Sequence, residues 1–222
     1  MTTSFALEGA GVVCGLQSEA RVLPPGGGYR IAISGASAAR AEAAARRLLE
    51  EGASRLLSFG VSGGLAPGAA IGDVIVAEAV TTQAGERWEA DAAWTDELAA
   101  GGSDEKRVSR TLILGSDAII GDTAQKQRLF EETGAFAVDM ESHAVARVAA
   151  EARVPFAALR AIADPADRAI PAIAAKGVGE AGETRAWPVL KAAIGRPADL
   201  LRLMKVGADS AAALKALRAI LS

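Results

Sequence analysis

Cysteine and histidine are almost absent from the 222-residue sequence, which contains one of each, Cys14 and His143. A single cysteine excludes an intrachain disulfide framework, and the apolar run around Cys14 is typical of a buried thiol in a reducing compartment. A single histidine excludes histidine-rich metal sites and makes any Ser-His-Asp triad depend on that one residue. We therefore expect no metal site, and we interpret His143 as a packed or surface residue of a helix rather than a catalyst.

Runs of like charge and long apolar segments are also missing. The 24 basic and 27 acidic residues give a net charge of -3 and form no basic stripe, so nucleic acid is not an expected partner. No segment approaches the length of a membrane span, and residues 1–10 lack the pattern of a secretory signal, which predicts a soluble, cytoplasmic protein. With 50% hydrophobic residues, the composition is ample for one core and predicts a single domain over residues 1–222.

Strand-like and helical segments alternate along the chain. Short apolar runs predict strands over residues 11–16, 29–34, 55–60, 73–82, 111–114, 135–139 and 155–163. Helical composition predicts helices over residues 37–51, 123–133 and 141–152. We interpret the first two runs as strands joined by a tight connection, and the polar stretch before residue 111 as a loop and a helix. The alternation predicts an α/β fold in which a mixed sheet is flanked by helices on both faces, in three layers (α/β/α).

The C-terminal part has a different pattern. Residues 187–221 contain no strand-like run, are interrupted at Gly195-Arg196-Pro197, and end with leucines on one helical face. We expect helices here, one of them capped by Asp209, which pack over the sheet rather than forming a separate domain.

Glycine-rich segments raise the question of a nucleotide cofactor. Gly9 and Gly11 nearly match the dinucleotide fingerprint, but Cys14 replaces the third glycine and the glycines precede the first strand. They cannot form the strand-to-helix turn that cradles phosphate, and no Walker A pattern occurs, so we expect no cofactor. Residues 60–68 do follow a strand and would let the backbone approach a flat ligand, although a turn without a ligand is an equal alternative.

Three acids lie where predicted strands end or helices begin. Glu141 opens a helix and Asp164 ends the next apolar run. Two acids at the same end of a sheet suit cleavage of a bond to a sugar, where one holds hydroxyls and the other protonates the leaving group. Glu19 follows the first strand, where open α/β sheets bind ligands. Structural roles are the alternatives: Asp164 could cap a following helix, and the two glutamates could be first-turn helix acids.

Six segments, in order and with compatible spacing, resemble the nucleoside phosphorylase and nucleosidase family, in particular its methylthioadenosine/adenosylhomocysteine nucleosidases. They are residues 15–19, 34–37, 60–73, 115–120, 138–144 and 160–164. The stretches ESHAVARVAA and LRAIADPADRAIP and the Arg196-Pro197 pair are most similar to hopanoid-associated phosphorylases. The resemblance implies the three-layer fold of nucleoside phosphorylases and an enzyme that breaks N-glycosidic bonds.

The resemblance assigns roles to four residues that act on the sugar and the leaving group. Glu141 matches the residue that binds the 2′- and 3′-hydroxyls, and Met140 matches the one that packs on ribose. Asp164 matches the acid that protonates N7 of the departing purine, and Glu19 matches the glutamate that organises the nucleophile. N-glycosidic cleavage passes through an oxocarbenium-like cation while charge accumulates on the purine, so an acid with a raised pKa would stabilise the leaving group.

Four further residues fall beside the base in this resemblance. Ser62 and Gly63 match the backbone strip along the base, and Ile119 and Ile120 stand where nucleosidases have an aromatic and an aliphatic residue. The base would therefore lie between aliphatic groups. Together with an aromatic content of only 4%, this is compatible with a substrate that carries a lipid.

The sequence also departs from the family pattern. Ala163 replaces the serine that nucleosidases usually have beside the acid, which removes a hydrogen bond that could position the carboxylate. Ser58 and Glu19 occupy the positions of the phosphate-binding arginines of typical bacterial purine nucleoside phosphorylases. We therefore take Arg21 and Ser37, which would lie in loops near the same sheet edge, as candidate phosphate ligands.

The resemblance implies release of adenine from an adenine nucleoside with an apolar 5′ substituent. The leading interpretation is phosphorolysis of adenosylhopane in hopanoid biosynthesis, with phosphate as co-substrate and no other cofactor. The alternatives are hydrolysis of methylthioadenosine or adenosylhomocysteine, and a non-catalytic nucleoside-binding protein on the same fold. The resemblance also implies a homodimer or larger homo-oligomer. Transient membrane contact, through which a lipid-linked nucleoside would be collected, is left open at this point.

Overall fold

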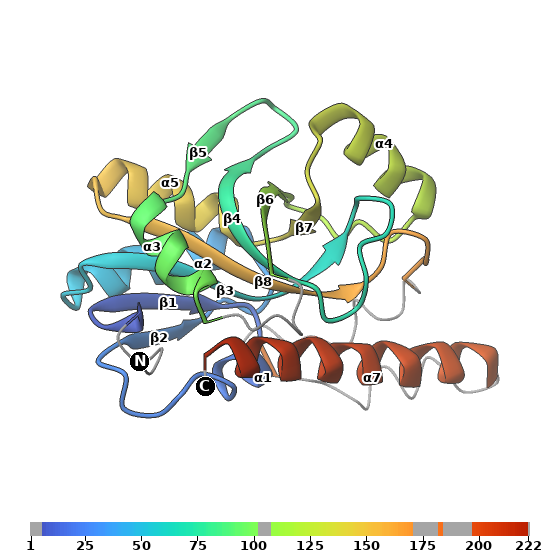
Figure 1. Ribbon diagram of the computed structural model, residues 1–222, viewed down its shortest axis with the longest axis horizontal. Helices are drawn as coiled ribbons and strands as arrows, with labels where there is room; N and C mark the ends of the chain where they lie inside the picture. Colours follow the sequence, from blue (N-terminus) through green and yellow to red (C-terminus); the bar gives the residue numbers. More distant parts are fainter. Residues whose placement is uncertain (1–5, 102–107, 171–181, 184–196, 222) are drawn as a thin grey trace.

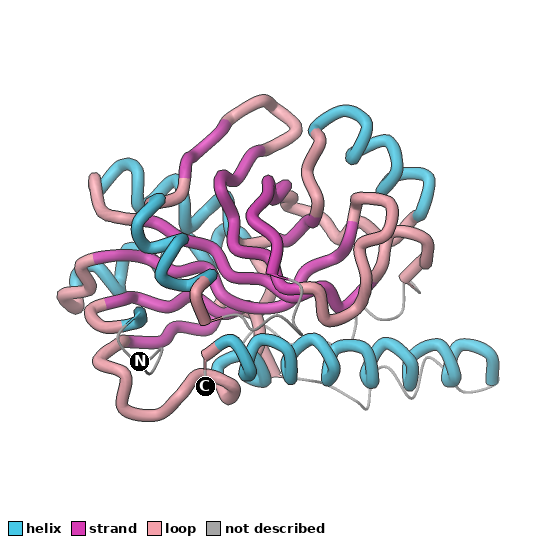
Figure 2. Tube along the Cα trace, viewed as in Figure 1, coloured by secondary structure: helices cyan, strands magenta, loops and turns pink. Residues whose placement is uncertain are grey.

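Eight strands pair into one mixed sheet (Figures 1 and 2). The computed structural model describes residues 6–101, 108–170, 182–183 and 197–221, with side chains from residue 205 onward in the last range. The strands are β1 (Ala10–Cys14), β2 (Arg30–Ile33), β3 (Arg55–Gly64), β4 (Val74–Thr81), β5 (Arg87–Glu89), β6 (Val108–Gly115), β7 (Ala137–Asp139) and β8 (Phe156–Asp164). The mixed sheet predicted from the alternating pattern is confirmed.

Five of the strands form a closed ring. β3 pairs with β8 and β7, β8 pairs with β4, β4 pairs with β6, and β6 pairs with β7. β1 and β2 extend this ring from the free edge of β3, and β5 continues from β4. Closure satisfies the backbone groups of the ring strands on both edges, and it brings the ends of β3, β7 and β8 together. The alternation of helices and strands predicts the mixed sheet but not this closure.

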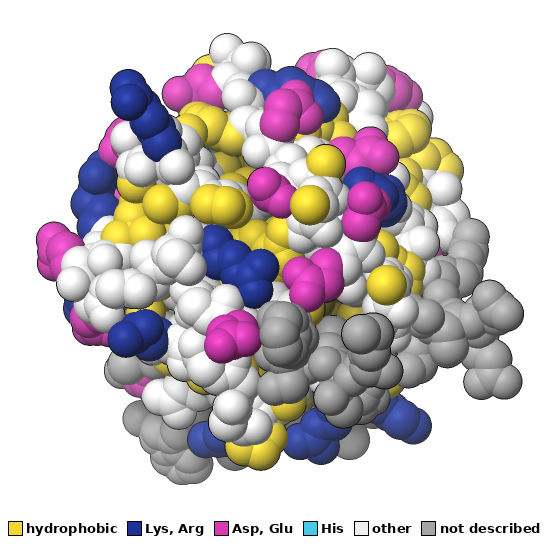
Figure 3. Space-filling view, turned by 60° about the vertical axis from the view of Figure 1, so that its left-hand side comes forward, with side chains coloured by type: hydrophobic (Ala, Val, Ile, Leu, Met, Phe, Trp, Pro, Cys, Tyr) yellow, Lys and Arg dark blue, Asp and Glu magenta, His cyan; other side chains and the backbone are white. Residues whose placement is uncertain are grey.

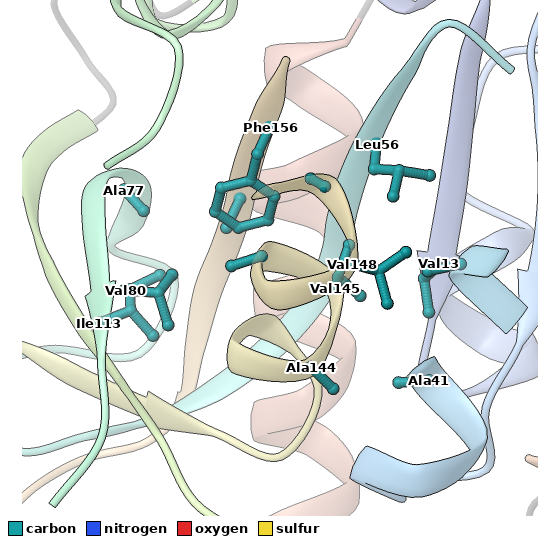
Figure 4. Packing of buried hydrophobic residues seen from close by; sticks show 14 of the residues in the cluster. Val13, Ala41, Leu56, Ala77, Val80, Ile113, Ala144, Val145, Val148 and Phe156 are labelled. Atoms are coloured by element: carbon teal, nitrogen blue, oxygen red, sulfur yellow. The ribbon is translucent and has the colours of Figure 1, made fainter. Parts of the chain in front are cut away.

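Helices cover both faces of the sheet, as predicted (Figure 1). They are α1 (Gln17–Ala20), α2 (Ala38–Glu50), α3 (Ala92–Ala99), α4 (Thr123–Thr133), α5 (Ser142–Ala152) and α7 (Pro197–Ile220). Because neighbouring strand residues point to opposite faces, Leu56 and Leu57 of β3 belong to different cores. Leu56 lies in the core with residues of α2 and α5, and Figure 4 shows it toward Val148 of α5. Leu57 lies in the core with Leu98 of α3 and Leu217 of α7. Two apolar cores therefore lie on either side of the same strands.

Two predictions about connections are wrong. β1 and β2 are parallel, with Val12 opposite Ile31, and α1 lies between them in sequence. Parallel neighbours require a crossover, so the glycine-rich segment before β2 is part of that crossover and no tight turn joins the strands. The polar stretch before residue 111 contains the predicted helix, α3, but also β5, whose short, largely exposed sequence has no apolar alternation.

Asp209 does not cap a helix. It lies inside α7, and its carboxylate accepts a hydrogen bond of 2.5 Å from Arg168 Nη2. This ion pair, together with the buried Ala213 and Leu217, holds α7 against the sheet and the segment that follows β8. The prediction that the tail packs over the sheet is therefore confirmed for the described part, whereas residues 187–196 lie outside it.

The surface carries charges of both signs. On the face in Figure 3, basic and acidic side chains are interspersed around small apolar areas rather than gathered in a stripe. In the part of the chain that the structure describes, no helix has the length and apolar character to cross a membrane.

Candidate active site

A cavity of about 250 Å³ opens where β1, β3, β7 and β8 end. Eight of the ten residues predicted to act at a site line it: Glu19, Ser62, Gly63, Ile119, Ile120, Met140, Glu141 and Asp164. They come from segments far apart in sequence, and closure of the strand ring brings them together. Asp139 also lines the cavity. The charged residues of the described lining are therefore Glu19, Asp139, Glu141 and Asp164, all of them acids.

The two candidate phosphate ligands do not line this cavity. Arg21 is exposed and follows the last residue of α1. Ser37 is the N-cap of α2, where its hydroxyl accepts a hydrogen bond of 3.5 Å from the backbone N–H of Arg40. Ser37 therefore has a structural role at the start of α2, Arg21 lies outside the cavity, and a phosphate-binding role stays a prediction for both.

Glu19 is buried and held by the backbone. Its two carboxylate oxygens accept N–H groups of Leu16 at 2.8 Å and Val61 at 2.9 Å. Gly60 has a φ of 155°, and a Cβ atom there would lie 2.6 Å from Glu19 Oε2. Burial raises the pKa of Glu19, and the charge of Arg160 and hydrogen bonds from the backbone of Val61, Leu16 and Gly15 act in the opposite direction. The glycine after Phe59 is therefore needed to make room for the carboxylate.

Glu141 faces a buried arginine. Its Oε2 lies 3.3 Å from Arg160 Nη2, and the Arg160 Nε lies 2.8 Å from Asp139 Oδ2. Arg160 Nη2 also donates to Ser58 Oγ at 2.6 Å. Burial raises the pKa of Glu141, the charge of Arg160 lowers it, and the charges of Asp139 and Glu19 raise it, with a net pKa of about 7. Glu141 therefore holds a proton more tightly than an ordinary glutamate does.

Asp139 holds the backbone at the start of α5. Its Oδ1 accepts the N–H groups of Glu141 at 3.0 Å and Ser142 at 2.8 Å, at the start of α5. A side chain that caps in this way satisfies N–H groups that a helix leaves unpaired. It also fixes the direction in which the Glu141 side chain leaves the backbone.

Arg160 and Asp139 were not recognised as site residues from the sequence. A signal was present, because Arg160 interrupts the apolar run FAALRAIA of β8. A fully buried arginine requires acidic or carbonyl partners. The identity of those partners depends on how β7 and β8 meet β3, which the sequence does not show.

Asp164 ends β8 beside the predicted base strip. In the sheet register it stands opposite Gly63, and its Oδ2 accepts a hydrogen bond from Nζ of Lys126. Burial raises the pKa of Asp164, while the hydrogen bond and charge of Lys126 lower it. The neighbouring Ser62 Oγ is buried without a hydrogen-bond partner among the described residues. A ligand against this strip would therefore meet an unused hydroxyl and an acid with a raised pKa.

Aliphatic side chains form the rest of the wall. Ile119 is 48% exposed and Ile120 is buried, and both follow β6 in the connection to α4. Ile170, from the segment after β8, and Val206, from α7, complete this apolar side. No group of three or more His, Cys, Asp or Glu in the described ranges is arranged to hold a metal ion.

Comparisons with known proteins agree with this geometry. The sequence profile described as the Phosphorylase superfamily matches residues 20–194. The chain belongs to this superfamily. The predicted nucleoside phosphorylase and nucleosidase family is therefore confirmed, and membership indicates a nucleoside-cleaving enzyme, either a phosphorylase or a nucleosidase. No curated protein sequence matched the chain.

Solved structures share the superfamily fold at low sequence identity. Futalosine hydrolase of Helicobacter pylori has a TM-score of 0.67 and 18% identity over 96% of each chain. The H. pylori 5′-methylthioadenosine/S-adenosylhomocysteine nucleosidase with butyl-thio-DADMe-Immucillin-A has a TM-score of 0.64 and 19% identity, covering 95% of this chain and 97% of that one. The Neisseria meningitidis nucleosidase with methylthio-immucillin-A has a TM-score of 0.65 and 21% identity, covering 94% and 97%. At these identities the likeness establishes the fold alone.

Proposed function

We propose that this protein releases adenine from an adenine nucleoside by cleaving its N-glycosidic bond. The observation that carries the proposal is the convergence of Glu19, Glu141 and Asp164 on one cavity, each in different surroundings. Glu19 and Glu141 lie near the buried Arg160, whereas Asp164 lies beside the strip of Ser62 and Gly63. Separate environments suit separate roles in one reaction.

Asp164 is the proposed acid at the leaving group. As the bond breaks, negative charge accumulates on the purine, and a proton or strong hydrogen bond at N7 stabilises it. Burial raises the pKa of Asp164, which favours the protonated form that can donate. Glu141 would hold the ribose hydroxyls, and its interaction becomes more favourable as positive charge develops on the sugar.

An apolar 5′ substituent is proposed for the substrate. The support is the aliphatic wall of Ile119, Ile120, Ile170 and Val206, of which Ile119 is 48% exposed. Both ligand-bound relatives described above carry alkylthio nucleoside analogues. Adenosylhopane, suggested by the sequence resemblance, is the leading candidate with a large apolar group.

Water is the proposed acceptor of the ribosyl group. All charged residues of the described cavity lining are acids. The described cations beside these acids are paired: Arg160 with Asp139 and Glu141, Lys126 with Asp164, and Arg168 with Asp209. With Asp164 protonated and Glu19, Asp139 and Glu141 ionised, the acids still outnumber the neighbouring cations. A phosphate dianion would then meet net negative charge, and like charges at such short range repel strongly in a protein interior. A neutral water molecule meets no such barrier and can be oriented by Glu19.

Phosphorolysis is the second candidate. Burial raises the pKa of Glu19, and a protonated Glu19 could donate a hydrogen bond to a phosphate oxygen instead of repelling it. The resemblance to hopanoid-associated phosphorylases favours this acceptor. Homo-oligomerisation and membrane contact stay predictions under either mechanism.

Adenine release from methylthioadenosine and adenosylhopane, each with and without phosphate, tests the proposal. We expect release that is independent of phosphate and yields a free ribosyl product. Release that requires phosphate and yields a ribosyl 1-phosphate would instead establish phosphorolysis. If the folded protein binds these nucleosides but releases adenine from none, the alternative of a non-catalytic binding protein replaces the proposal.

A further inference from the structure

Lys126 is fully buried and clamps the segment that carries Asp164. It lies on α4, and its ammonium group donates to Asp164 Oδ2, to the carbonyl oxygen of Pro165 at 2.9 Å and to that of Arg168 at 2.9 Å. An ammonium group has three N–H donors, so these contacts use all of them. Lys126 does not line the cavity and therefore does not contact a ligand there.

The helix that carries this lysine, α4, is capped at both ends. Asp122 caps the start of the helix by accepting the N–H of Gln125 at 2.9 Å, and Gly134 ends it in the left-handed conformation. Leu129 packs one turn beyond Lys126 in an apolar cluster with Leu65 and Val138. The ammonium group is thus delivered from a rigid element.

A buried lysine needs an explanation. Removing an ammonium ion from water costs several kcal/mol, and an apolar residue of similar volume is often as stable at such a site. Stability alone therefore does not account for Lys126. The contacts of Lys126 suggest a different role. They hold both the side chain of Asp164 and the backbone that follows it, beside the strip of Ser62 and Gly63.

We propose that Lys126 is a positioning residue that orients the carboxyl group of Asp164 for proton donation. Lys126 engages Oδ2 of Asp164, and no described residue donates a hydrogen bond to Oδ1. A proton on Oδ1 is then the one that a purine can accept. This inference rests on the proposed function.

The same contact sets the strength of the acid. The charged groups that affect Asp164 are Lys126 from α4, Arg168 from the following segment and Asp209 from α7. Burial raises the pKa of Asp164. Lys126 and Arg168 lower it, and Asp209 raises it. Because Arg168 is paired with Asp209, Lys126 is the dominant opposing charge. Its removal should therefore raise the pKa of Asp164.

The test is the pH profile of kcat for wild type, Lys126→Gln and Lys126→Arg. If protonated Asp164 is required, kcat falls at alkaline pH as this acid ionises in the complex. In K126Q we expect that alkaline limb to move to higher pH, and kcat on the plateau to fall by about tenfold or more, with a smaller change in KM, because a misoriented acid loses part of its catalytic contribution. In K126R the charge is kept, so the limb should stay near its wild-type position while the plateau falls.

Arg128→Gln is the matched control. Arg128 is an exposed residue of the same helix, so its loss changes the helix charge without touching Asp164, and the profile should be unchanged. An unmoved limb in folded K126Q would overturn the inference. If K126Q does not fold, a K126R variant with the wild-type plateau would overturn it equally.

Failure of the proposed function would be distinguishable. A wild-type protein that releases no adenine refutes the nucleoside-cleaving proposal, whatever the variants do. Titration of the Asp164 carboxyl carbon by ¹³C NMR then still reports on the pair: the pKa of Asp164 should be higher in K126Q than in wild type. An equal pKa would contradict control of Asp164 by Lys126.

Discussion

Arg160 Nη2 lies 3.3 Å from Glu141 Oε2, with both side chains buried at the junction of β8 and α5. The same guanidinium contacts Asp139 through Nε at 2.8 Å. One cation thus serves two acids, and the charge of Arg160 also lowers the pKa of Glu19. The negative charges of Asp139, Glu141 and Glu19 are therefore offset by this single side chain.

Arg160→Met should therefore destabilise the protein strongly. Loss of one partner from a buried ion pair leaves uncompensated charge and costs about 3–5 kcal/mol. Chemical denaturation at pH 7 measures this change in the free energy of unfolding. Arg46→Ala is the control, because Arg46 pairs with Glu42 and Glu151 on the surface, and it should change stability little. Equal effects of the two substitutions would contradict the assigned role of Arg160.

Asp164→Asn should abolish adenine release while the fold is kept. An amide cannot donate a carboxylic proton, and loss of general acid catalysis reduces turnover by about 10²- to 10⁴-fold. Steady-state kinetics with far-UV circular dichroism measures both effects. Asp96→Asn, an identical change at a surface residue paired with Arg110, should leave turnover unchanged. Wild-type turnover in D164N would remove Asp164 from the mechanism.

Stability should fall between about pH 4.5 and pH 7 because of Glu141. Its pKa rises from 4.5 to about 7 on folding, so in this window the native state binds more protons than the unfolded state. The free energy of unfolding then decreases as pH increases. Glu141→Gln removes this contribution, so the decline should be shallower in the variant. Identical slopes in urea titrations of the two proteins would rule out the raised pKa.

Gly60→Ala should affect activity through Glu19. The φ of 155° disfavours a side chain, and the new Cβ would lie 2.6 Å from Glu19 Oε2, so the carboxylate must move. Gly134→Ala is the matched control: Gly134 also has a positive φ, but a Cβ there meets no atom within 4 Å. It should cost only about 1–2 kcal/mol of backbone strain and leave turnover intact. We expect the folded G60A protein to have lower turnover than the folded G134A protein. Equal turnover in the two variants would contradict a role of Gly60 in placing Glu19.

The sequence predicted the elements well where a local pattern existed. Residues 123–133 form α4 as expected, and the acids Glu141 and Asp164 lie at the ends of the expected segments. Predictions were wrong where pairing or context decides: the connection of β1 and β2, the exposed strand β5 and the interior position of Asp209. Strand direction depends on partners distant in sequence, and an acid within a helix is accommodated by an ion pair that no local pattern reveals.

By itself, the sequence determined the α/β class, the family and eight residues that line the cavity, because periodicity and ordered motifs are local properties of the chain. The tertiary structure decided how the acids are used. Arg160 meets Asp139 and Glu141, and Lys126 meets Asp164, only because the closed strand ring and α4 bring those side chains within hydrogen-bond distance. Burial and charge at such distances set the proton affinity of a carboxylate, and both are properties of the folded chain.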